Sequence, residues 1–441
     1  MTREPSRNPD GAPATVAVIG VGYVGLTTAA CLAHLGNRVH AVDVDEAKVQ
    51  RMSRGVSPIL EEGLEDLMRE GIDSGRLTFT TDAGAAAAGA DFVFLCVPTP
   101  QGADGAADLR FVEQASAQIA PHLKPGAIVV TKSTVPVGSA GKVVAALGRP
   151  DTSVVSNPEF LREGTAVHDW LHPDRVVIGS EDRAAGERLA ALYEPLGAPV
   201  IITDPASSET IKYACNAFLA AKVSFVNAIA NLCAAVGADA VDVIRGMSYD
   251  RRIGADHLSP GPGWGGSCFP KDTSALIRVA EEHGYDFALL REVVAANEAQ
   301  FDFVADQIQA AAGGRLDGNV VAVWGLTFKA GTDDLRESPA VSVLRRLLAR
   351  GARVRAFDPT RPDPANGFLR DLNLELVDDP YRCCEGASAV AVLTEWPEFR
   401  AYDLARAAAA MAHPAVVDTR NIFQPAEARA AGMTYTGMGR S

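Results

Sequence analysis

The sequence has 441 residues and a formal net charge of −14 at pH 7, with 41 Lys and Arg against 55 Asp and Glu. Such an acidic chain is unsuited to general binding of nucleic acid or of an anionic membrane surface. Hydrophobic residues (47%) and charged residues (22%) lie in the ordinary globular range, and the 40 glycines follow no Gly-X-Y period, which excludes disordered and collagen-like chains. The length predicts two or three domains.

The seven cysteines show no framework spacing. Their number is odd, no CxxC occurs, and two of them are adjacent, which is a poor geometry for zinc. We therefore expect a reducing, cytoplasmic compartment and no structural metal. The cysteines are Cys31, Cys96, Cys215, Cys233, Cys268, Cys383 and Cys384.

An uncharged stretch near the N-terminus, residues 15–33, has the composition of a signal peptide or membrane anchor. It contains Gly20, Gly22 and Gly25 at the spacing of a dinucleotide-binding turn, and an α/β pattern continues beyond it. We therefore expect no membrane segment. Residues 1–13 are polar and rich in proline, which predicts a disordered tail.

The predicted elements begin with a βαβ unit, in which a strand at 14–20, a helix to about Leu35 and a strand at 38–45 follow one another. Helical patterns separate most of the later strands. This alternation predicts a doubly wound α/β domain over residues 14–205. The later strands are expected at 91–98, 127–133, 153–158 and 175–180.

A long, largely apolar pattern at 207–236 starts with serine and is followed by Gly237, which predicts a single helix. A helix this apolar should be buried on most of its faces, so we expect it between domains or in a homodimer interface. More helices are predicted up to about residue 312.

The α/β pattern then returns in three strands, 319–326, 352–359 and 387–397. The expected fold class is therefore α/β, with two Rossmann-like doubly wound domains joined by a long central helix and a helical middle segment. The middle segment, 206–312, is expected to serve dimerisation and substrate binding, and the second domain spans 313–441.

The turn Gly20-Val-Gly-Tyr-Val-Gly25 follows a strand and opens a helix, whose N-terminus offers free N–H groups to a pyrophosphate. Asp43 ends the next strand, where a carboxylate accepts hydrogen bonds from the ribose and disfavours a 2′-phosphate, so NAD is expected rather than NADP. The alternative is a glycine turn with a surface aspartate. Lys48 is either a second ribose-side contact or an exposed helix lysine.

The segment Gly261-Pro-Gly-Trp-Gly-Gly-Ser-Cys268-Phe-Pro-Lys-Asp272 is the most informative stretch. Its four glycines allow the backbone to wrap closely around a ligand. A cysteine in such a polar loop is not placed like a core cysteine, and it can ionise and act as a nucleophile. An inert thiol remains the alternative.

Other candidate groups have ordinary alternatives. Lys212 and Asn216 share a face of the long helix and could stabilise an oxyanion, unless the lysine extends to water. Glu159 and Glu163 follow a strand and could act as a general base or a cofactor contact, but solvated loop acids fit their spacing better. Thr134 ends a strand and could simply cap the next helix.

Taken together, these motifs resemble the nucleotide-sugar 6-dehydrogenase family. The resemblance spans about residues 14–421, and the cysteine loop is its most specific part. The motifs occur in family order: GYVGL, CVPTP (96–100), KSTVPVG (132–138), NPEFLREGTA (157–166), ETIKYACNAFLA (209–220), RRIG (251–254), GPGWGGSCFPKD (261–272) and GLTFKAGTDDLRESPA (325–340).

The resemblance implies a four-electron oxidation of the sugar C6 alcohol to a carboxylate, with two NAD consumed. A thiolate adds to the aldehyde, the thiohemiacetal is oxidised to a thioester, and water releases the acid. The matching catalytic groups are Cys268 as nucleophile, Lys212 with Asn216 as oxyanion stabilisers, Asp272 and Thr134 as water-positioning groups, and Glu159 as general base.

Two further sets of residues resemble binding groups. The cofactor contacts are Gly20, Val21, Gly22, Tyr23, Val24, Gly25, Asp43, Lys48, Pro98, Thr99, Thr134, Glu163, Lys271 and Arg336. The nucleotide-sugar contacts are Glu159, Phe160, Leu161, Lys212, Asn216, Arg252, His257, Leu258, Ser259, Pro260, Gly261, Gly265, Phe328 and Lys329. In the family, the arginine that matches Arg252 can reach the sugar across a dimer.

The sequence departs from the family pattern at Trp264, where Phe or Tyr is usual. The form GGSCFPKD separates it from UDP-N-acetylmannosamine relatives, whose loop has His before Cys, and together with RRIG it favours glucose over GDP-mannose. UDP-glucose is the expected substrate. The alternatives are dTDP-glucose or GDP-mannose, a two-electron NAD-dependent hydroxyacid dehydrogenase, and a non-catalytic sensor of NAD or nucleotide sugar.

Overall fold

The computed structural model describes residues 13–102 and 107–440. The chain divides into two compact units, one of residues up to Cys215 with Ser274–Gly284, the other of Asn216–Thr273 with residues from Tyr285 onward. The predicted domain boundaries at 205 and 312 remain predictions. The predicted disordered tail lies outside the described residues, apart from Pro13.

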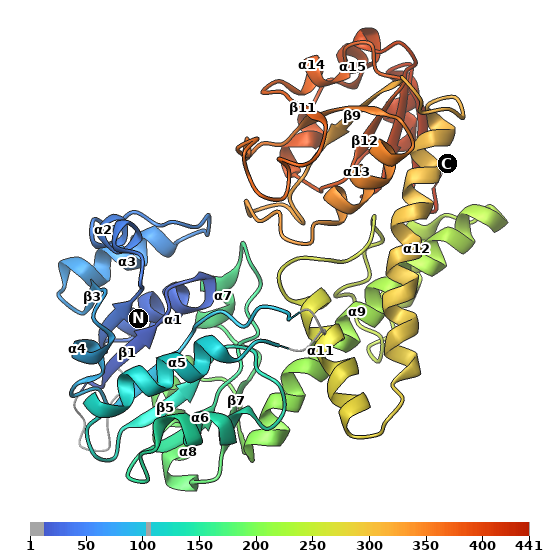
Figure 1. Ribbon diagram of the computed structural model, residues 1–441. Coiled ribbons are helices and arrows are strands. Elements are labelled where there is room, and N and C mark those ends of the chain that lie inside the picture. Colours follow the sequence, from blue (N-terminus) through green and yellow to red (C-terminus); the bar gives the residue numbers. More distant parts are fainter. Residues whose placement is uncertain (1–12, 103–106, 441) are drawn as a thin grey trace. The chain divides into compact units, whose positions relative to one another are not determined.

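The first unit contains an eight-stranded sheet with the order β3-β2-β1-β4-β5-β6-β7-β8. Figure 1 labels β1, β3, β5 and β7 of this sheet. Neighbouring strands are parallel except for the pair β6 and β7. Strands β3 and β8 are absent from the sequence prediction. The strands are β1 (Thr15–Ile19), β2 (Arg38–Val42), β3 (Leu77–Thr80), β4 (Phe92–Leu95), β5 (Ile128–Thr131), β6 (Ser153–Ser156), β7 (Val176–Ser180) and β8 (Val200–Thr203).

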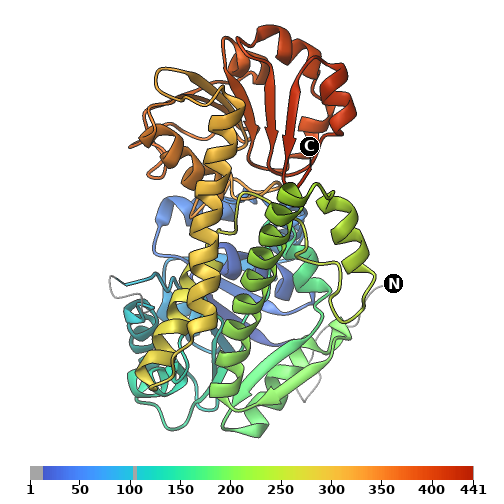
Figure 2. The same ribbon diagram turned by 90° about the vertical axis from the view of Figure 1, so that its right-hand side faces the viewer.

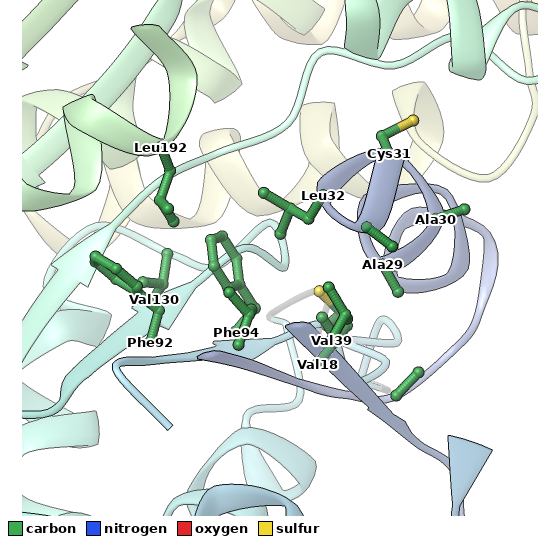
Figure 3. Packing of buried hydrophobic residues seen from close by; sticks show 14 of the residues in the cluster. Val18, Ala29, Ala30, Cys31, Leu32, Val39, Phe92, Phe94, Val130 and Leu192 are labelled. Carbon is green, nitrogen blue, oxygen red and sulfur yellow. The ribbon is translucent and has the colours of Figure 1, made fainter. Parts of the chain in front are cut away.

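Helices cover both faces of this sheet, because the alternating side chains of its strands are apolar on both sides. Val18 packs in one buried cluster and Ile19 in the other. Figure 3 shows the first cluster, where Leu32 and Phe94 meet. Each such side chain stabilises the fold by about 1.5–3 kcal/mol. The helices are α1 (Tyr23–His34), α2 (Glu46–Ser53), α3 (Leu64–Asp73), α4 (Ala83–Ala87), α5 (Arg110–Ile119), η1 (Ala120–His122), α6 (Ser139–Leu147), α7 (Ala166–Leu171), α8 (Arg183–Tyr193) and η2 (Glu194–Leu196).

Helix α9 (Pro205–Val236) confirms the predicted long helix, and Gly237 follows it with φ 75°. Most residues of α9 are buried or half-buried, and the exposed apolar side chains Phe218, Phe225 and Leu232 (66%, 55% and 56% exposed) recur at seven-residue intervals along one face. Among the described residues, α9 is the one helix long and apolar enough to cross a membrane by length and composition, a test that core helices of globular proteins also pass.

The second unit combines helices with a six-stranded parallel sheet of order β11-β10-β9-β12-β13-β14. Its helix α12 (Ala288–Ala311) runs beside the second-unit part of α9 (Figure 2). The strands are β9 (Val320–Trp324), β10 (Arg353–Phe357), β11 (Leu374–Leu376), β12 (Ala389–Val392), β13 (Ala415–Asp418) and β14 (Thr434–Gly437). The other helices are α10 (Ala240–Ser248), α11 (Phe269–Glu282, which crosses the division between the units), α13 (Pro339–Ala349), α14 (Pro380–Cys384), η3 (Pro397–Ala401), α15 (Leu404–Ala410) and α16 (Pro425–Ala430).

The two sheets confirm the predicted fold class of two Rossmann-like domains with a helical segment in the chain between them. The prediction missed β11, β13 and β14. The adjacent Cys383 and Cys384 are both inaccessible to solvent in the core of this unit.

Candidate active site

The glycine turn between β1 and α1 has the geometry of a dinucleotide-binding loop. Gly20 has φ 90°, and a Cβ there would lie 2.8 Å from the Cys96 carbonyl oxygen. A Cβ on Gly25 would lie 1.9 Å from the Gly20 carbonyl oxygen. Both positions therefore require glycine for packing. A Cβ on Gly22 would meet nothing within 4 Å, so this residue faces open space at the start of α1, where a pyrophosphate fits.

Asp43 follows β2 and faces this turn. Its Oδ2 accepts a hydrogen bond from the Val21 N–H (3.3 Å) and pairs with Lys48 Nζ (2.6 Å). Burial acts to raise the pKa of Asp43, but hydrogen bonds from Lys48 and from the Asp45 N–H lower it overall. The carboxylate is therefore ionised beside the turn, as an acceptor for ribose hydroxyls requires. Lys48 is not simply an exposed helix lysine, because it is paired with Asp43.

The post-β6 segment carries a buried ion pair. Glu159 Oε1 lies 3.0 Å from Lys212 Nζ, and Glu159 Oε2 accepts the Leu161 N–H at 2.7 Å. Both charged side chains are about 5% exposed or less. Burial acts to raise the pKa of Glu159, but Lys212 lowers it overall. The alternatives of a solvated acid at Glu159 and a lysine extended to water at Lys212 are therefore wrong.

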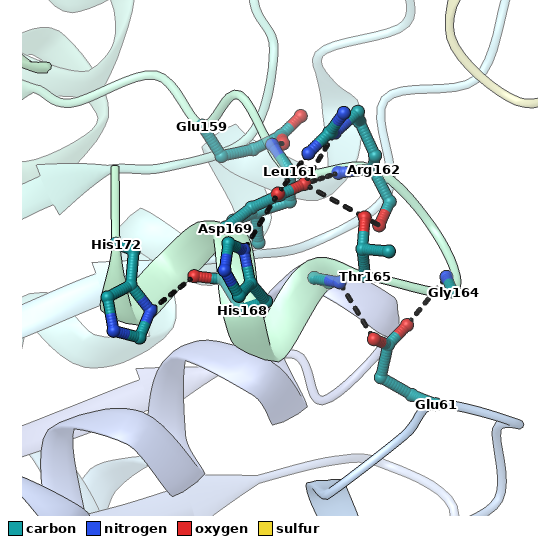
Figure 4. Close-up of polar contacts among 10 residues, drawn as sticks. Glu61, Glu159, Leu161, Arg162, Gly164, Thr165, His168, Asp169 and His172 are labelled. Carbon is teal, nitrogen blue, oxygen red and sulfur yellow. Dashed lines mark hydrogen bonds and ion pairs between the residues drawn. The ribbon is translucent and has the colours of Figure 1, made fainter. Parts of the chain in front are cut away.

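The loop that carries Glu159 is fixed by two carboxylates (Figure 4). Glu61 accepts the Gly164 and Ala166 N–H groups, each at 2.7 Å, and also accepts a hydrogen bond from the Tyr23 hydroxyl. Asp169 forms a two-pronged pair with Arg162, at 2.6 and 2.9 Å. Half-buried Glu163 lies between these two anchors. Glu61 was not predicted from the sequence, because the loop N–H groups that it accepts are more than 100 residues away in the chain.

Thr134 lies in the β5–α6 loop and is 8% exposed. Its carbonyl oxygen accepts a hydrogen bond from Thr99 Oγ1 (2.9 Å), so the structure brings these two predicted cofactor contacts together. The helix-cap alternative for Thr134 is wrong, since Gly138 is the N-cap of α6. Glu209 accepts the Gly138 and Ala140 N–H groups at 2.6 and 3.1 Å, and burial raises its pKa to about 7.

In the second unit, Cys268 immediately precedes α11, and its carbonyl oxygen accepts the Asp272 N–H (2.9 Å). The partial positive charge at a helix N-terminus stabilises a thiolate. Asp272 is 1% exposed, accepts a hydrogen bond from Asn216 Nδ2 (2.6 Å) and pairs with Lys271 Nζ (2.5 Å). The predicted nucleophile and three of its predicted neighbours therefore form one cluster. Burial raises the pKa of Cys96, by contrast, to about 12.

A ladder of buried amides holds the glycine loop that leads to Cys268. The Asn297 amide accepts the Trp264 N–H (2.8 Å) and donates to the Trp264 carbonyl (2.9 Å). Asn227 accepts the Gly261 N–H (2.8 Å), and Gln300 donates to the Gly261 carbonyl (2.9 Å). Asn227, Asn297 and Gln300 were not among the predicted site residues. The available signal for them was the recurrence of amide side chains about one turn apart in apolar helices.

The loop after β9 packs on the same glycine segment. The Glu337 carbonyl accepts the Gly266 N–H (3.1 Å), with Glu337 at φ 47°. A Cβ on Gly266 would lie 2.9 Å from the Phe328 ring. These contacts bring Phe328, one of the predicted nucleotide-sugar contacts, beside the cysteine loop.

Arg420, another residue that the sequence analysis missed, reaches this region from the end of β13. It donates to the Leu393 and Phe328 carbonyl oxygens. A Cβ on Gly261 would lie 2.8 Å from the guanidinium group of Arg420.

Two other predicted contacts of the second unit, Arg252 and Arg336, form ion pairs with aspartates close to them in the chain. Arg252 is exposed and pairs with Asp250 (2.6 Å), and half-exposed Arg336 pairs with Asp334 (2.6 Å). His257 has φ 59° and is half-buried, whereas Leu258 is buried. Across the described residues, no three His, Cys, Asp or Glu side chains group as metal ligands.

The fold and these clusters define a dehydrogenase with an NAD-type Rossmann domain and a second, Rossmann-like domain. Family models cover most of the chain: the NAD-binding domain of the UDP-glucose/GDP-mannose dehydrogenase family matches residues 14–197, its central domain 206–299 and its UDP-binding domain 322–425. The chain belongs to the UDP-glucose/GDP-mannose dehydrogenase family.

Curated relatives resemble it over nearly the whole length. A UDP-glucose 6-dehydrogenase of Pseudomonas aeruginosa is 46% identical, over 96% of this chain and 97% of the relative, and one of Rhizobium meliloti is 44% identical, over 96% and 99%. Among solved structures, a UDP-glucose dehydrogenase from Pyrobaculum islandicum matches with a TM-score of 0.89 and 37% identity, over 98% of both chains. A UDP-D-ManNAc dehydrogenase from Pyrococcus horikoshii matches with a TM-score of 0.85 and 27% identity, over 96% of this chain and 99% of that one.

Proposed function

We propose that this protein is an NAD-dependent UDP-glucose 6-dehydrogenase that converts UDP-glucose to UDP-glucuronate through a covalent intermediate on Cys268. One observation carries the proposal: a partly exposed cysteine lies at the start of a helix, beside a buried Asp272 that is hydrogen-bonded to Asn216. A two-electron alcohol dehydrogenase needs no such thiol. The 46% identity to a UDP-glucose 6-dehydrogenase supports the same activity.

The glycine turn, with Gly22 open to a ligand, would hold the NAD pyrophosphate, and Asp43 would accept the ribose hydroxyls. The bound nicotinamide supplies a hydride acceptor in each of the two oxidation steps. Glu159, ionised through its pairing with Lys212, takes the proton of the C6 hydroxyl as hydride leaves. The product of this step is the aldehyde.

The Cys268 sulfur then adds to the aldehyde carbon, and Lys212 with Asn216 stabilises the resulting oxyanion. Loss of a second hydride from C6 turns this thiohemiacetal into a thioester. Asp272 and Thr134 position the water that attacks the thioester carbonyl, which expels the thiolate and gives the carboxylate. Two NAD are reduced for each sugar acid.

The nucleotide half of the substrate is assigned to the second unit. Phe328 and Lys329, with the segment 257–261 and Gly265, would contact it. Glu163, Lys271 and Arg336 are assigned to the cofactor. Lys271 forms an ion pair with Asp272, which places its charge next to a proposed catalytic group.

A homodimer is part of the proposal. Phe218, Phe225 and Leu232 recur at seven-residue intervals along α9, which places them on one face of the helix, and all are more than half exposed. An exposed apolar stripe of this length is typical of a protein interface. Arg252 would reach the partner's sugar across it. Light scattering should give twice the chain mass, and Phe225→Glu should shift the protein toward monomer. We place the reaction in the cytoplasm.

The direct test is a panel of nucleotide sugars with NAD, with NADH followed by absorbance and the product identified by mass. We expect UDP-glucose to give the sugar acid with two NADH for each product. Preference for dTDP-glucose or GDP-mannose would change the substrate but keep the chemistry. One NADH for each product would favour a two-electron dehydrogenase, and no reduction with any sugar would favour a sensor.

A further inference from the structure

Lys132 is a buried ammonium group that the proposed chemistry does not use. It follows β5, is 5% exposed, and donates to Asn157 Oδ1 (3.0 Å) and to the Tyr193 hydroxyl (3.5 Å). Within the described part of the chain, no carboxylate oxygen lies within ion-pair distance of its Nζ. An ammonium group is expensive to bury without a direct ion pair, so this lysine requires a compensating interaction.

The immediate partners of Lys132 remain neutral. Asn157 Nδ2 donates to the Val177 carbonyl (2.8 Å), which fixes the amide so that its Oδ1 faces Lys132 and Tyr193. The Tyr193 hydroxyl donates to the same Oδ1 (2.6 Å), and burial raises its pKa far above the usual range. Burial also raises the pKa of nearby Cys96 to about 12. None of these groups therefore supplies a negative charge near neutral pH.

The negative charge comes from Glu159, two residues after Asn157. Its direct partner is Lys212, and Lys132 acts as a second positive charge that lowers the pKa of Glu159 further. Burial, with a smaller effect from the like charge of Lys212, lowers the pKa of Lys132 itself to about 8. The buried group thus contains one carboxylate and two ammonium groups, of which Lys212 is in direct contact with the carboxylate.

We propose that Lys132 is a positioning residue for Glu159, whose buried ammonium holds that carboxylate in its ionised form and, through Asn157, fixes the segment that carries it. The inference rests on the proposed role of Glu159 as the general base. It makes Lys132 an electrostatic partner of a base that it does not touch directly, and it gives a reason for a lysine at this buried position.

The test compares the pH profile of kcat/KM for UDP-glucose in wild type, Lys132→Met and Tyr193→Phe. Loss of a nearby positive charge makes a carboxylate harder to ionise, so the acid limb of Lys132→Met should move up by about one pH unit. In Tyr193→Phe the ammonium remains and only a hydroxyl is lost, so its acid limb should stay in place. An unmoved limb in Lys132→Met, or an equal shift in both variants, overturns the proposal.

Two further measurements keep the test decisive. Lys132→Gln retains a donor for Asn157 Oδ1 without the charge, and it should show the same shift if Lys132→Met fails to fold. The carboxylate infrared band of Glu159, identified by its loss in Glu159→Gln, should titrate at higher pH in Lys132→Gln than in wild type. This band needs no turnover, so it tests Lys132 even if UDP-glucose proves not to be the substrate. An unchanged titration contradicts the proposal.

Discussion

The two Rossmann-like sheets of this protein begin in the same way and then diverge. In the first unit, residues 20–22 connect β1 to α1, whereas in the second, residues 325–338 connect β9 to α13. Each loop opens with a glycine in the left-handed region, Gly20 at φ 90° and Gly325 at φ 94°. The strand geometry is therefore shared, and the difference lies in the length and contacts of the loop beyond the glycine.

The carboxylates that follow β2 and β10, the second strands of the two sheets, show the consequence of this difference between the loops. Asp43 accepts one loop N–H and pairs with Lys48, and its side chain is 13% exposed. Asp358 is 1% exposed, and its Oδ2 accepts the Leu326 and Thr327 N–H groups at 2.7 and 3.2 Å. Asp358 thus accepts the N–H groups at the start of the second loop. The additional residues of this longer loop pack on the cysteine loop and not on a dinucleotide.

The first variant tests the first half of this comparison. Asp43→Ala removes a charged acceptor for the ribose, and hydrogen bonds to charged groups contribute about 1.5–3 kcal/mol. We expect the Kd for NAD to rise about 10- to 100-fold, with the midpoint of urea unfolding almost unchanged. Fluorescence titration with NAD measures the first quantity. Unchanged NAD binding would show that the carboxylate does not face the cofactor.

The matched variant in the second sheet should lower stability and leave NAD binding unchanged. Asp358→Ala leaves the buried Leu326 and Thr327 N–H groups without an acceptor, at a cost of about 1–3 kcal/mol each. We expect the free energy of unfolding to fall by about 2–4 kcal/mol, while the folded protein binds NAD as wild type does. A Kd for NAD that rises as much as in Asp43→Ala would refute the division of roles between the two sheets.

A smaller effect is expected for Glu209, a buried carboxyl group of the first unit that accepts hydrogen bonds from backbone N–H groups. Burial raises its pKa from 4.5 to about 7 in the folded protein, so between these values the folded state keeps a proton that the unfolded state has lost. Its contribution to stability is therefore full below about pH 4.5 and is lost as the pH rises to about 7, on the order of 1–3 kcal/mol. Urea unfolding of Glu209→Gln should show a flatter pH dependence across this window. An identical slope in wild type would contradict the assignment.

The parts of the fold that the sequence predicts are its longer apolar strands and the central helix. The missed strands are short, and two of them, Leu77–Thr80 and Leu374–Leu376, alternate apolar with polar residues near sheet edges. Three- and four-residue patterns of this kind do not differ from loops until a neighbouring strand supplies the hydrogen bonds.

The site was predicted chiefly through its motifs and not through residue spacing. Spacing alone favoured a solvated Glu159, because the lysine that neutralises it lies 53 residues away in the chain. Glu61, Asn297 and Arg420 escaped notice for the same reason, since each bonds backbone groups that only the folded chain brings near. Sequence motifs predict the groups that carry out the chemistry. The residues that hold these groups in place are identified only from the tertiary contacts of the folded chain.

The central claim is that Cys268 carries the half-oxidised sugar. Rapid quenching of the enzyme with UDP-glucose and NAD, followed by mass spectrometry of its peptides, tests this claim most directly. We expect the Cys268 peptide to gain the mass of a UDP-glucuronyl thioester, and Cys268→Ala to show neither the adduct nor net formation of the acid. An unmodified Cys268 peptide, together with a Cys268→Ala enzyme that makes UDP-glucuronate at the wild-type rate, would contradict the account.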